Sequence, residues 1–172
     1  MLPSALRIPG LNQLVPPRIA AEAYRVLNRR GITNLQHGFF VRGFADEHRL
    51  QGIDELSLCA GGTQVAELCD DEIREFKLSA NDFSFLPVSA ESISPPAGMT
   101  KGAFSLGILN REIAGPPLQM VLANASLLFI LAGRAKHYRH GYELAEEVFA
   151  SGEVLAKIGR LRSILSTGIL AV

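Results

Sequence analysis

The sequence has few of the residues that cross-link or strongly charge a small protein. Its 172 residues include no tryptophan and only 2 cysteines, and 17 Lys and Arg balance 17 Asp and Glu. Cys59 and Cys69 can form neither a disulfide framework nor a zinc site of four cysteines, so we expect buried, reduced thiols. The zero net charge excludes a strongly basic nucleic-acid binder, and we expect no nucleic-acid partner.

A hydrophobic run long enough to cross a membrane is also missing. The most apolar stretch, Met120–Ala132, contains Asn124 and Ser126 and is too short to span a bilayer. The first residues do not place a basic region before an apolar run, as a secretory signal peptide would. We therefore expect a cytoplasmic protein with no membrane partner, and the length predicts a single domain over residues 1–172.

The first half of the sequence predicts one helix and three strands. Pro3, Pro9 and Gly10 make residues 1–16 an irregular N-terminal segment. A helix is expected from Pro17 to the Arg29-Arg30 pair before Gly31. The remaining expected elements are a strand over Asn34–Val41, a polar loop over residues 42–51, and strands Thr63–Leu68 and Ile73–Leu78 joined by a turn at Asp70–Glu72.

The second half is predicted to be helical. Ser79 caps a short turn that begins at Ala80, and residues 87–100 form a loop rich in Ser, Pro and Gly. The expected helices are Ala103–Ile113, Pro117–Leu131, Gly141–Ala150 and Glu153–Leu165, and the last of them has an apolar stripe that we expect to face inward. This order of elements predicts an α/β fold, with a small mixed sheet that contains a β-hairpin and is covered by helices.

The greatest concentration of chemically useful groups is the segment Gly52-Ile53-Asp54-Glu55-Leu56-Ser57. Adjacent carboxylates in a loop can both face a divalent cation, because loop backbone does not force alternate side chains onto opposite faces. Mg²⁺ takes oxygen ligands, often one or two carboxylates with water and substrate phosphates. Spacing alone leaves a second interpretation open, in which Asp54 and Glu55 form a solvated turn.

Several motifs in the same order resemble the anthranilate phosphoribosyltransferase family. The first is Gly-Ile-Asp-Glu-Leu-Ser at residues 52–57, followed by a strand that ends Val-Ala-Glu-Leu at residues 65–68. The later ones are Asp82-Phe83, Ile108-Leu109 before Gly115-Pro116, Val-Leu-Ala-Asn-Ala at residues 121–125, Ala-Gly-Arg-Ala at residues 132–135, and Ser151-Gly152. The resemblance runs from about Asn12 to Leu165.

This resemblance implies the C-terminal part of the nucleoside phosphorylase/phosphoribosyltransferase catalytic domain. The implied reaction moves phosphoribose from phosphoribosyl pyrophosphate (PRPP) to anthranilate, in tryptophan biosynthesis. By residue match, Asp54 and Glu55 would be Mg²⁺ ligands, and Ser57 would orient the loop through a hydrogen bond behind them. The implied partners are PRPP or pyrophosphate and an anthranilate-like acceptor, if the full-length parent is active.

The sequence departs from the family in one large respect and one local one. It contains no Gly-Thr-Gly-Gly-Asp pattern, which in the family is the loop that cradles the diphosphate, and it matches only the C-terminal half of such enzymes. Arg42-Gly43 stands where the family has His-Gly, and residues 44–51 are an insertion. We therefore expect no turnover by this chain alone and self-association into a homo-oligomer through uncovered apolar surface. The alternative is a non-catalytic paralogue or fragment that acts as a binding or assembly module.

Overall fold

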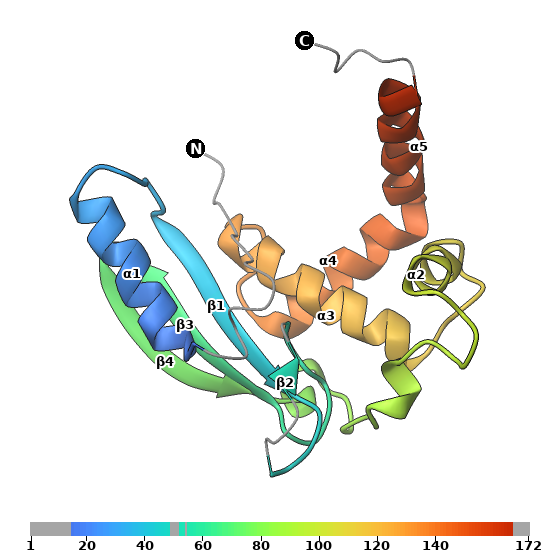
Figure 1. Ribbon diagram of the computed structural model, residues 1–172, viewed down its shortest axis with the longest axis horizontal. Helices are drawn as coiled ribbons and strands as arrows, with labels where there is room; N and C mark the ends of the chain where they lie inside the picture. The colour runs from blue at the N-terminus through green and yellow to red at the C-terminus, as the bar shows by residue number, and fades with distance from the viewer. Residues whose placement is uncertain (1–14, 49–51, 54, 167–172) are drawn as a thin grey trace.

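A four-stranded antiparallel sheet carries helices on both of its faces (Figure 1). The computed structural model describes residues 15–48, 52–53 and 55–166. The elements are α1 (Pro17–Arg29), β1 (His37–Phe44), β2 (Gly52–Ile53), β3 (Thr63–Cys69), β4 (Glu72–Leu78), the 3-10 turns η1 (Ala80–Phe83) and η2 (Glu91–Ile93), α2 (Lys101–Leu109), α3 (Pro116–Leu131), α4 (Tyr138–Ser151) and α5 (Glu153–Ser166). Among these described residues, no helix is long and apolar enough to cross a membrane.

The strand order is β2-β1-β3-β4, and every neighbouring pair is antiparallel. The α/β class and the hairpin are confirmed, but the expectation of a mixed sheet is wrong for the named strands. Parallel neighbours need a long crossover, usually a helix. Here α1 precedes the first strand and α2–α5 all follow the last one, so none of these helices connects two strands. Within the part of the chain that the structure describes, the one parallel pairing is an isolated bridge between Cys59 and Val88 outside the strands.

The two faces of the sheet bury two separate hydrophobic clusters because strand side chains alternate. On one face α1 packs through Ala21 against Phe40 of β1 and Leu68 of β3. On the other face, Val65 of β3 lies in a larger cluster with residues of α3 and α4, such as Leu127. The two layers lie on opposite sides of the sheet in Figure 1.

Most predicted elements are present, with shifted ends. The helix that begins at Pro17 ends at Arg29, and Gly31 has the left-handed φ of 69° that the sequence suggested. The first strand lies three residues further along than predicted, at His37–Phe44, and therefore takes in the start of the predicted loop. The helix predicted over Ala103–Ile113 is Lys101–Leu109, with Thr100 as its N-cap. The predicted irregular segment 1–16 lies almost wholly outside the described residues.

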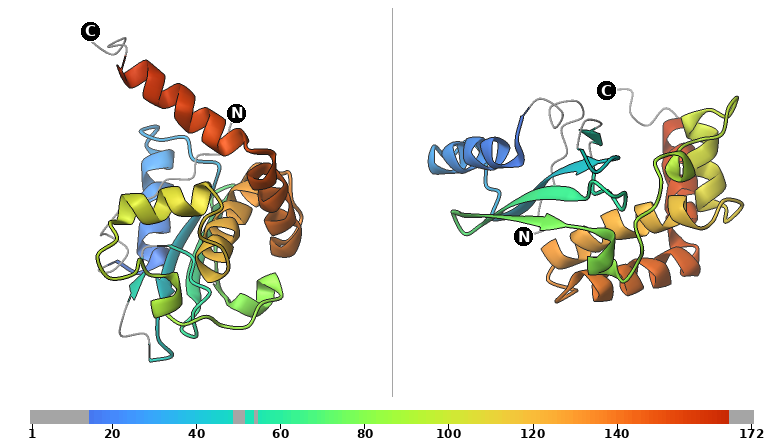
Figure 2. Two further views of the ribbon diagram at one scale, coloured as in Figure 1. Left: turned by 90° about the vertical axis from the view of Figure 1, so that its right-hand side faces the viewer. Right: turned by 90° about the horizontal axis from the view of Figure 1, so that it is seen from below.

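Helix α5 leaves the C-terminal half of its predicted apolar stripe exposed, whereas Val154, Leu155 and Ile158 in the first half are half-buried. It extends away from the body of the molecule and packs against α4 at one end (Figures 1 and 2). Leu161, Ile164 and Leu165 are 52%, 43% and 66% exposed. The expectation that these three residues face inward is therefore wrong within this chain.

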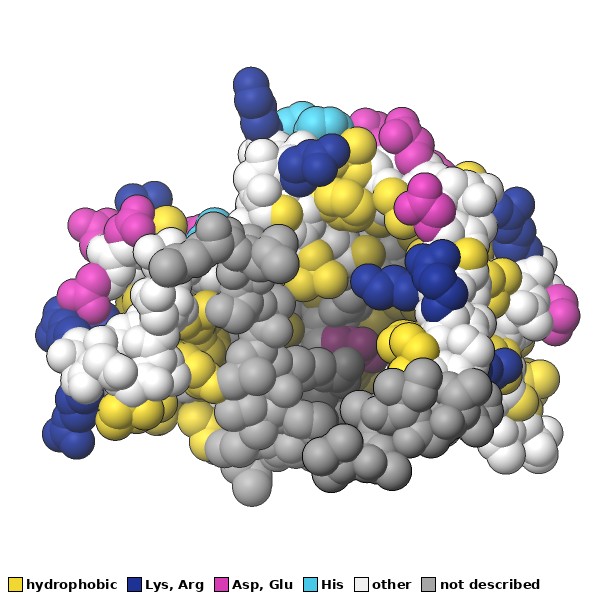
Figure 3. Space-filling view, turned by 90° about the horizontal axis from the view of Figure 1, so that it is seen from above, with side chains coloured by type: hydrophobic (Ala, Val, Ile, Leu, Met, Phe, Trp, Pro, Cys, Tyr) yellow, Lys and Arg dark blue, Asp and Glu magenta, His cyan; other side chains and the backbone are white. Residues whose placement is uncertain are grey.

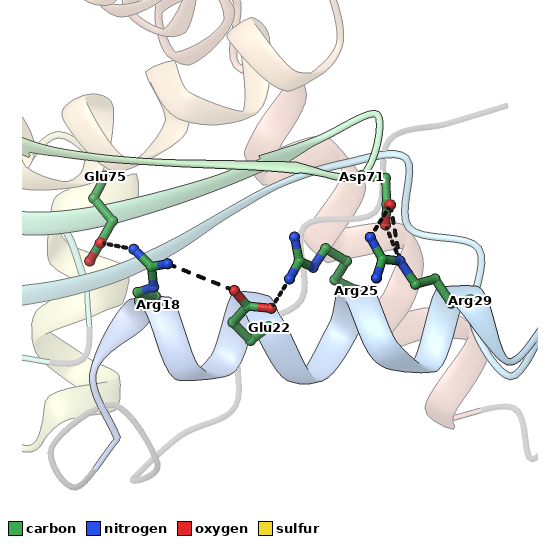
Figure 4. A network of polar contacts seen from close by, with 6 residues as sticks. All are labelled: Arg18, Glu22, Arg25, Arg29, Asp71 and Glu75. Atoms are coloured by element: carbon green, nitrogen blue, oxygen red, sulfur yellow. Dashed lines mark hydrogen bonds and ion pairs between the residues drawn. The ribbon is translucent and has the colours of Figure 1, made fainter.

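Helix α1 is also attached to the hairpin by a row of exposed ion pairs (Figure 4). Arg18 donates to Glu75 on β4 at 2.8 Å, and Arg29 donates to Asp71 in the hairpin turn at 2.6 Å. Glu22 lies between them and pairs with Arg25 at 2.6 Å. The hydrogen bonds from Arg29 hold the pKa of the Asp71 carboxyl below its usual range.

Candidate functional site

The candidate site is the irregular segment Glu55–Cys59, which links β2 to the start of β3. It belongs to none of the four strands of the described sheet, yet four consecutive backbone N–H groups each donate to a side chain. Buried backbone groups need such partners, and most find them in helices or sheets. The four donor–acceptor pairs, with distances from the nitrogen, are Leu56 to Asn124 Oδ1 (3.0 Å), Ser57 to Thr63 Oγ1 (2.8 Å), Leu58 to Met120 Sδ (3.2 Å) and Cys59 to Ser57 Oγ (3.0 Å).

Ser57 is the centre of this arrangement and is fully buried. Its Oγ donates to the Phe44 carbonyl oxygen at 2.8 Å while it accepts from the Cys59 N–H. One hydroxyl thus joins the end of β1 to two positions of the segment. Ser57 holds the segment by hydrogen bonds, and the role behind metal ligands that the resemblance implied for it stays a prediction.

Gly43 explains why β1 can pass so close to the segment. A Cβ at this position would collide with the carbonyl oxygen of Glu55 and would lie 2.8 Å from the Ser57 Cβ. A real Cβ does not approach other heavy atoms so closely, so the position requires glycine. The Gly of Arg42-Gly43, in the place of the family's His-Gly, therefore has a steric reason that is visible in this chain.

The structure describes one of the two predicted carboxylate ligands of Mg²⁺. Glu55 is half-buried at the start of the segment, and Ser57 is two residues further on. Asp54 lies outside the described residues. Among the residues that the structure describes, no group of three or more His, Cys, Asp or Glu side chains is placed to hold a metal ion. The oxygen donor of Glu55 nevertheless suits Mg²⁺, which often takes only one or two protein carboxylates and completes its shell with water and substrate phosphates.

The surface is hollowed on the upper side of the molecule (Figure 3). An acidic side chain lies at the base of the hollow, and Lys or Arg side chains lie beside it on the right in that view. A hollow with an acidic base and basic groups beside it can accept a metal together with an anionic ligand, since the two charges then have opposite partners.

Sequence reasoning missed a second polar pair, at the far end of the same sheet face as Val65. His37 Nε2 lies 2.7 Å from Glu67 Oε1, and both side chains are about three-quarters buried. Tyr138 at the start of α4 has its pKa raised to about 12 by burial and by the nearby charges of Glu67 and Asp82. Register on β1 and β3 creates this pair, so the spacing of 30 residues gives no local signal for it.

The comparisons with known proteins agree with the sequence motifs. The family model described as "Glycosyl transferase family, a/b domain" matches residues 33–155. A curated anthranilate phosphoribosyltransferase from Laribacter hongkongensis is 33% identical over 154 residues, which are 87% of this chain and 42% of the relative. Anthranilate phosphoribosyltransferase 1 from Ralstonia nicotianae is 32% identical over 84% of this chain and 39% of the relative.

A solved structure supports the same fold. Anthranilate phosphoribosyltransferase from Saccharomyces cerevisiae, in complex with 4-fluoroanthranilate, matches with a TM-score of 0.65 at 19% identity, over 87% of this chain and 41% of that one. The chain thus spans about two fifths of the length of the proteins that it matches. The resemblance seen in the motifs is confirmed: this chain belongs to the glycosyl transferase family with the a/b domain, among relatives that are anthranilate phosphoribosyltransferases.

Proposed function

We propose that this chain is the C-terminal portion of an anthranilate phosphoribosyltransferase-like glycosyltransferase, and that it contributes the carboxylates of Asp54 and Glu55 to a magnesium-pyrophosphate site. The proposed reaction moves the phosphoribosyl group of PRPP to anthranilate or a similar acceptor. The observation that carries the proposal is the fixed Glu55–Cys59 segment, in a chain whose curated relatives are named for this activity.

The chemistry explains why a fixed carboxylate is useful there. When the bond from C1 of the ribose to pyrophosphate breaks, its electron pair leaves with the pyrophosphate oxygen, and negative charge grows on that group. A magnesium ion bound to the pyrophosphate supplies positive charge against it. A carboxylate on a preorganised backbone keeps its place during this step, so little reorganisation is needed as the charge develops.

Titration of Mn²⁺, as a paramagnetic probe for Mg²⁺, tests the metal assignment in the presence of pyrophosphate. We expect Asp54→Asn and Glu55→Gln each to weaken Mn²⁺ binding by at least about tenfold, since each removes a charged oxygen ligand. Glu147→Gln, which changes an exposed carboxylate on α4, is the matched control and should bind as the unaltered chain does. Equal binding by all four proteins would remove the assignment.

We propose further that the chain alone does not turn over substrate, because its sequence has no Gly-Thr-Gly-Gly-Asp loop for the diphosphate. Incubation with PRPP, anthranilate and Mg²⁺ should consume no more anthranilate than a control without protein. Consumption above that control would refute this part of the proposal. Metal binding without turnover would fit a catalytic portion, whereas the absence of both would favour the alternative of a binding or assembly module.

We also propose that the protein is cytoplasmic.

We propose that the chain associates with itself into a homo-oligomer. Leu161, Ile164 and Leu165 form an exposed apolar stripe on α5, and Val121 and Leu128 are 42% and 53% exposed on α3. Exposed apolar surface of this kind is commonly covered by another chain. Sedimentation should show a concentration-dependent rise in mass, and a monomer at high concentration would contradict the proposal.

A further inference from the structure

Asn124 makes an unusually complete set of hydrogen bonds to the candidate site. Its Oδ1 accepts from the N–H of Leu56 at 3.0 Å, and its Nδ2 donates to the carbonyl oxygen of the same residue at 3.1 Å. Nδ2 also donates to the carbonyl oxygen of Met120 at 2.9 Å, one turn back on α3. Both amide hydrogens and the carbonyl oxygen of the side chain are therefore used. The bonding pattern also fixes which end of the amide is which.

Helix α3 here takes the place of a neighbouring strand. Leu56 and Leu58 are two residues apart, and residues so spaced in extended backbone direct their N–H groups to the same side. Both N–H groups point to α3, where Asn124 and Met120 are four residues apart and so share one face of the helix. The leucine side chains are fully buried in the core cluster that includes Met120. The segment is thus held on α3 by packing and hydrogen bonds together.

Leu56 lies directly beside Glu55, so the bonds of Asn124 act one residue from the proposed metal ligand. Thr63 holds the segment from β3, and the Ser57 hydroxyl holds it to the end of β1, but neither bonds the N–H or the carbonyl oxygen of Leu56. Among the hydrogen bonds of the described residues, Asn124 is the partner for both groups of Leu56. Loss of Asn124 would therefore leave the peptide units on either side of Leu56 without a fixed orientation.

We infer that Asn124 is a positioning residue for the metal site: it fixes the backbone at Leu56 and thereby sets where the Glu55 carboxylate lies. This inference rests on the proposed function for its metal, but its structural part can be tested separately. Asn124 does not touch a substrate in this scheme. It acts on Glu55 through the backbone of Leu56.

Two substitutions separate the chemistry of the amide from its size. Asn124→Asp keeps the shape but places an acceptor oxygen opposite the carbonyl oxygens of Leu56 and Met120, so two hydrogen bonds become repulsive contacts. Asn124→Ala removes all three bonds and leaves the backbone groups of Leu56 unpaired. Gln119→Glu makes the same amide-to-acid change on the first turn of α3, where a negative charge is tolerated. Leu127→Ala destabilises the core without a bond to the segment.

The first measurement is amide hydrogen exchange by NMR on the full chain. We expect the Leu56 N–H to exchange at least about tenfold faster, relative to the Val65 N–H in β3, in Asn124→Ala and Asn124→Asp. Leu127→Ala should leave this ratio unchanged, because core destabilisation raises both rates together. Gln119→Glu should also leave it unchanged, since it is the same chemical change at another position of α3. An unchanged ratio in both Asn124 variants would overturn the inference.

The second measurement is Mn²⁺ affinity with pyrophosphate, at a temperature where every variant is folded. We expect the two Asn124 variants to bind at least about tenfold more weakly, as a displaced carboxylate would, and Leu127→Ala to bind normally. Normal binding by the Asn124 variants, despite a faster Leu56 N–H, would refute the positioning role. If the unaltered chain binds no Mn²⁺, the metal assignment fails, and the role of Asn124 at Leu56 is decided by the exchange ratio alone.

Discussion

Two parts of this chain are attached to the same sheet by opposite means. Helix α1 is held to the β3–β4 hairpin by surface ion pairs, Arg18 to Glu75 and Arg29 to Asp71. The side chains of these pairs are 48–58% exposed. The segment Glu55–Cys59 is fastened by hydrogen bonds between its backbone and side chains, and Ser57 at its centre is fully buried.

The difference follows from what each part can do for itself. A helix satisfies its own backbone, so α1 needs the sheet mainly to bury apolar residues such as Ala21, and its surface ion pairs add little. The irregular segment cannot satisfy its N–H groups with its own backbone carbonyls, and each N–H left unpaired in the interior would cost about 1–3 kcal/mol. The polar contacts of α1 therefore adjust stability, whereas those of the segment determine its conformation.

The largest expected effect comes from forcing β1 and the segment apart. Gly43→Ala would place a Cβ against the carbonyl oxygen of Glu55, and backbone cannot move aside as a flexible side chain can. We expect a loss of about 3 kcal/mol or more in the free energy of unfolding, as for severe overpacking. Urea denaturation followed by circular dichroism measures it.

The same chemical change elsewhere provides the control for Gly43. Gly159 lies inside α5, and a Cβ there would meet nothing within 4 Å. Gly159→Ala should leave stability unchanged or raise it, by up to about 1 kcal/mol, because alanine is the better helix former. Equal, small effects at both positions would show that the segment is not held against β1 as described.

A smaller effect is expected when the segment loses one bonding group without a clash. Ser57→Ala leaves the Phe44 carbonyl oxygen and the Cys59 N–H without this hydroxyl, and we expect a loss of about 1–3 kcal/mol by urea denaturation. Ser126→Ala is a matched control, since Ser126 is also fully buried but donates only to Ala123 in its own helix. That control should cost less than Ser57→Ala, and the reverse order would contradict the comparison.

Local patterns in the sequence predicted the α1 side of the molecule better than the segment. Pro17 at a helix start and the acidic turn at Asp70-Asp71 act through neighbouring residues, so their signals lie within a few positions. The segment depends on Thr63, Met120 and Asn124, the last of which lies 68 residues from Leu56. No periodicity links positions so far apart.

One signal for Asn124 was nevertheless present. It is a polar residue in a largely apolar helix, and a polar group in such a place normally has a hydrogen-bond partner. The sequence could show that a partner was needed but not that it was Leu56. The apolar stripe of α5 is similar: its spacing indicates a face that packs against something, and in this chain Leu161 remains exposed.

The smallest expected effect is on the α1 side. Arg29→Ala removes the hydrogen bonds to Asp71, and because both side chains are solvated we expect a loss of stability smaller than that of Ser57→Ala. The lowered pKa of Asp71 gives it a definite pH dependence. A carboxyl whose pKa is lower in the folded state stabilises the protein above its unfolded pKa of about 3.9, and this contribution is lost as the pH falls through the folded pKa.

Urea midpoints of the unaltered chain and Arg29→Ala should therefore differ near pH 7 and converge in strong acid, where Asp71 is protonated in both folded states. High salt at pH 7 should reduce the same difference, since exposed ion pairs are screened. Asp71→Asn removes the charge at every pH. When Arg29→Ala is added to Asp71→Asn, the urea midpoint should therefore change little. A difference that persists in strong acid and high salt would mean that Arg29 acts through packing, and α1 would then be attached much as the buried segment is.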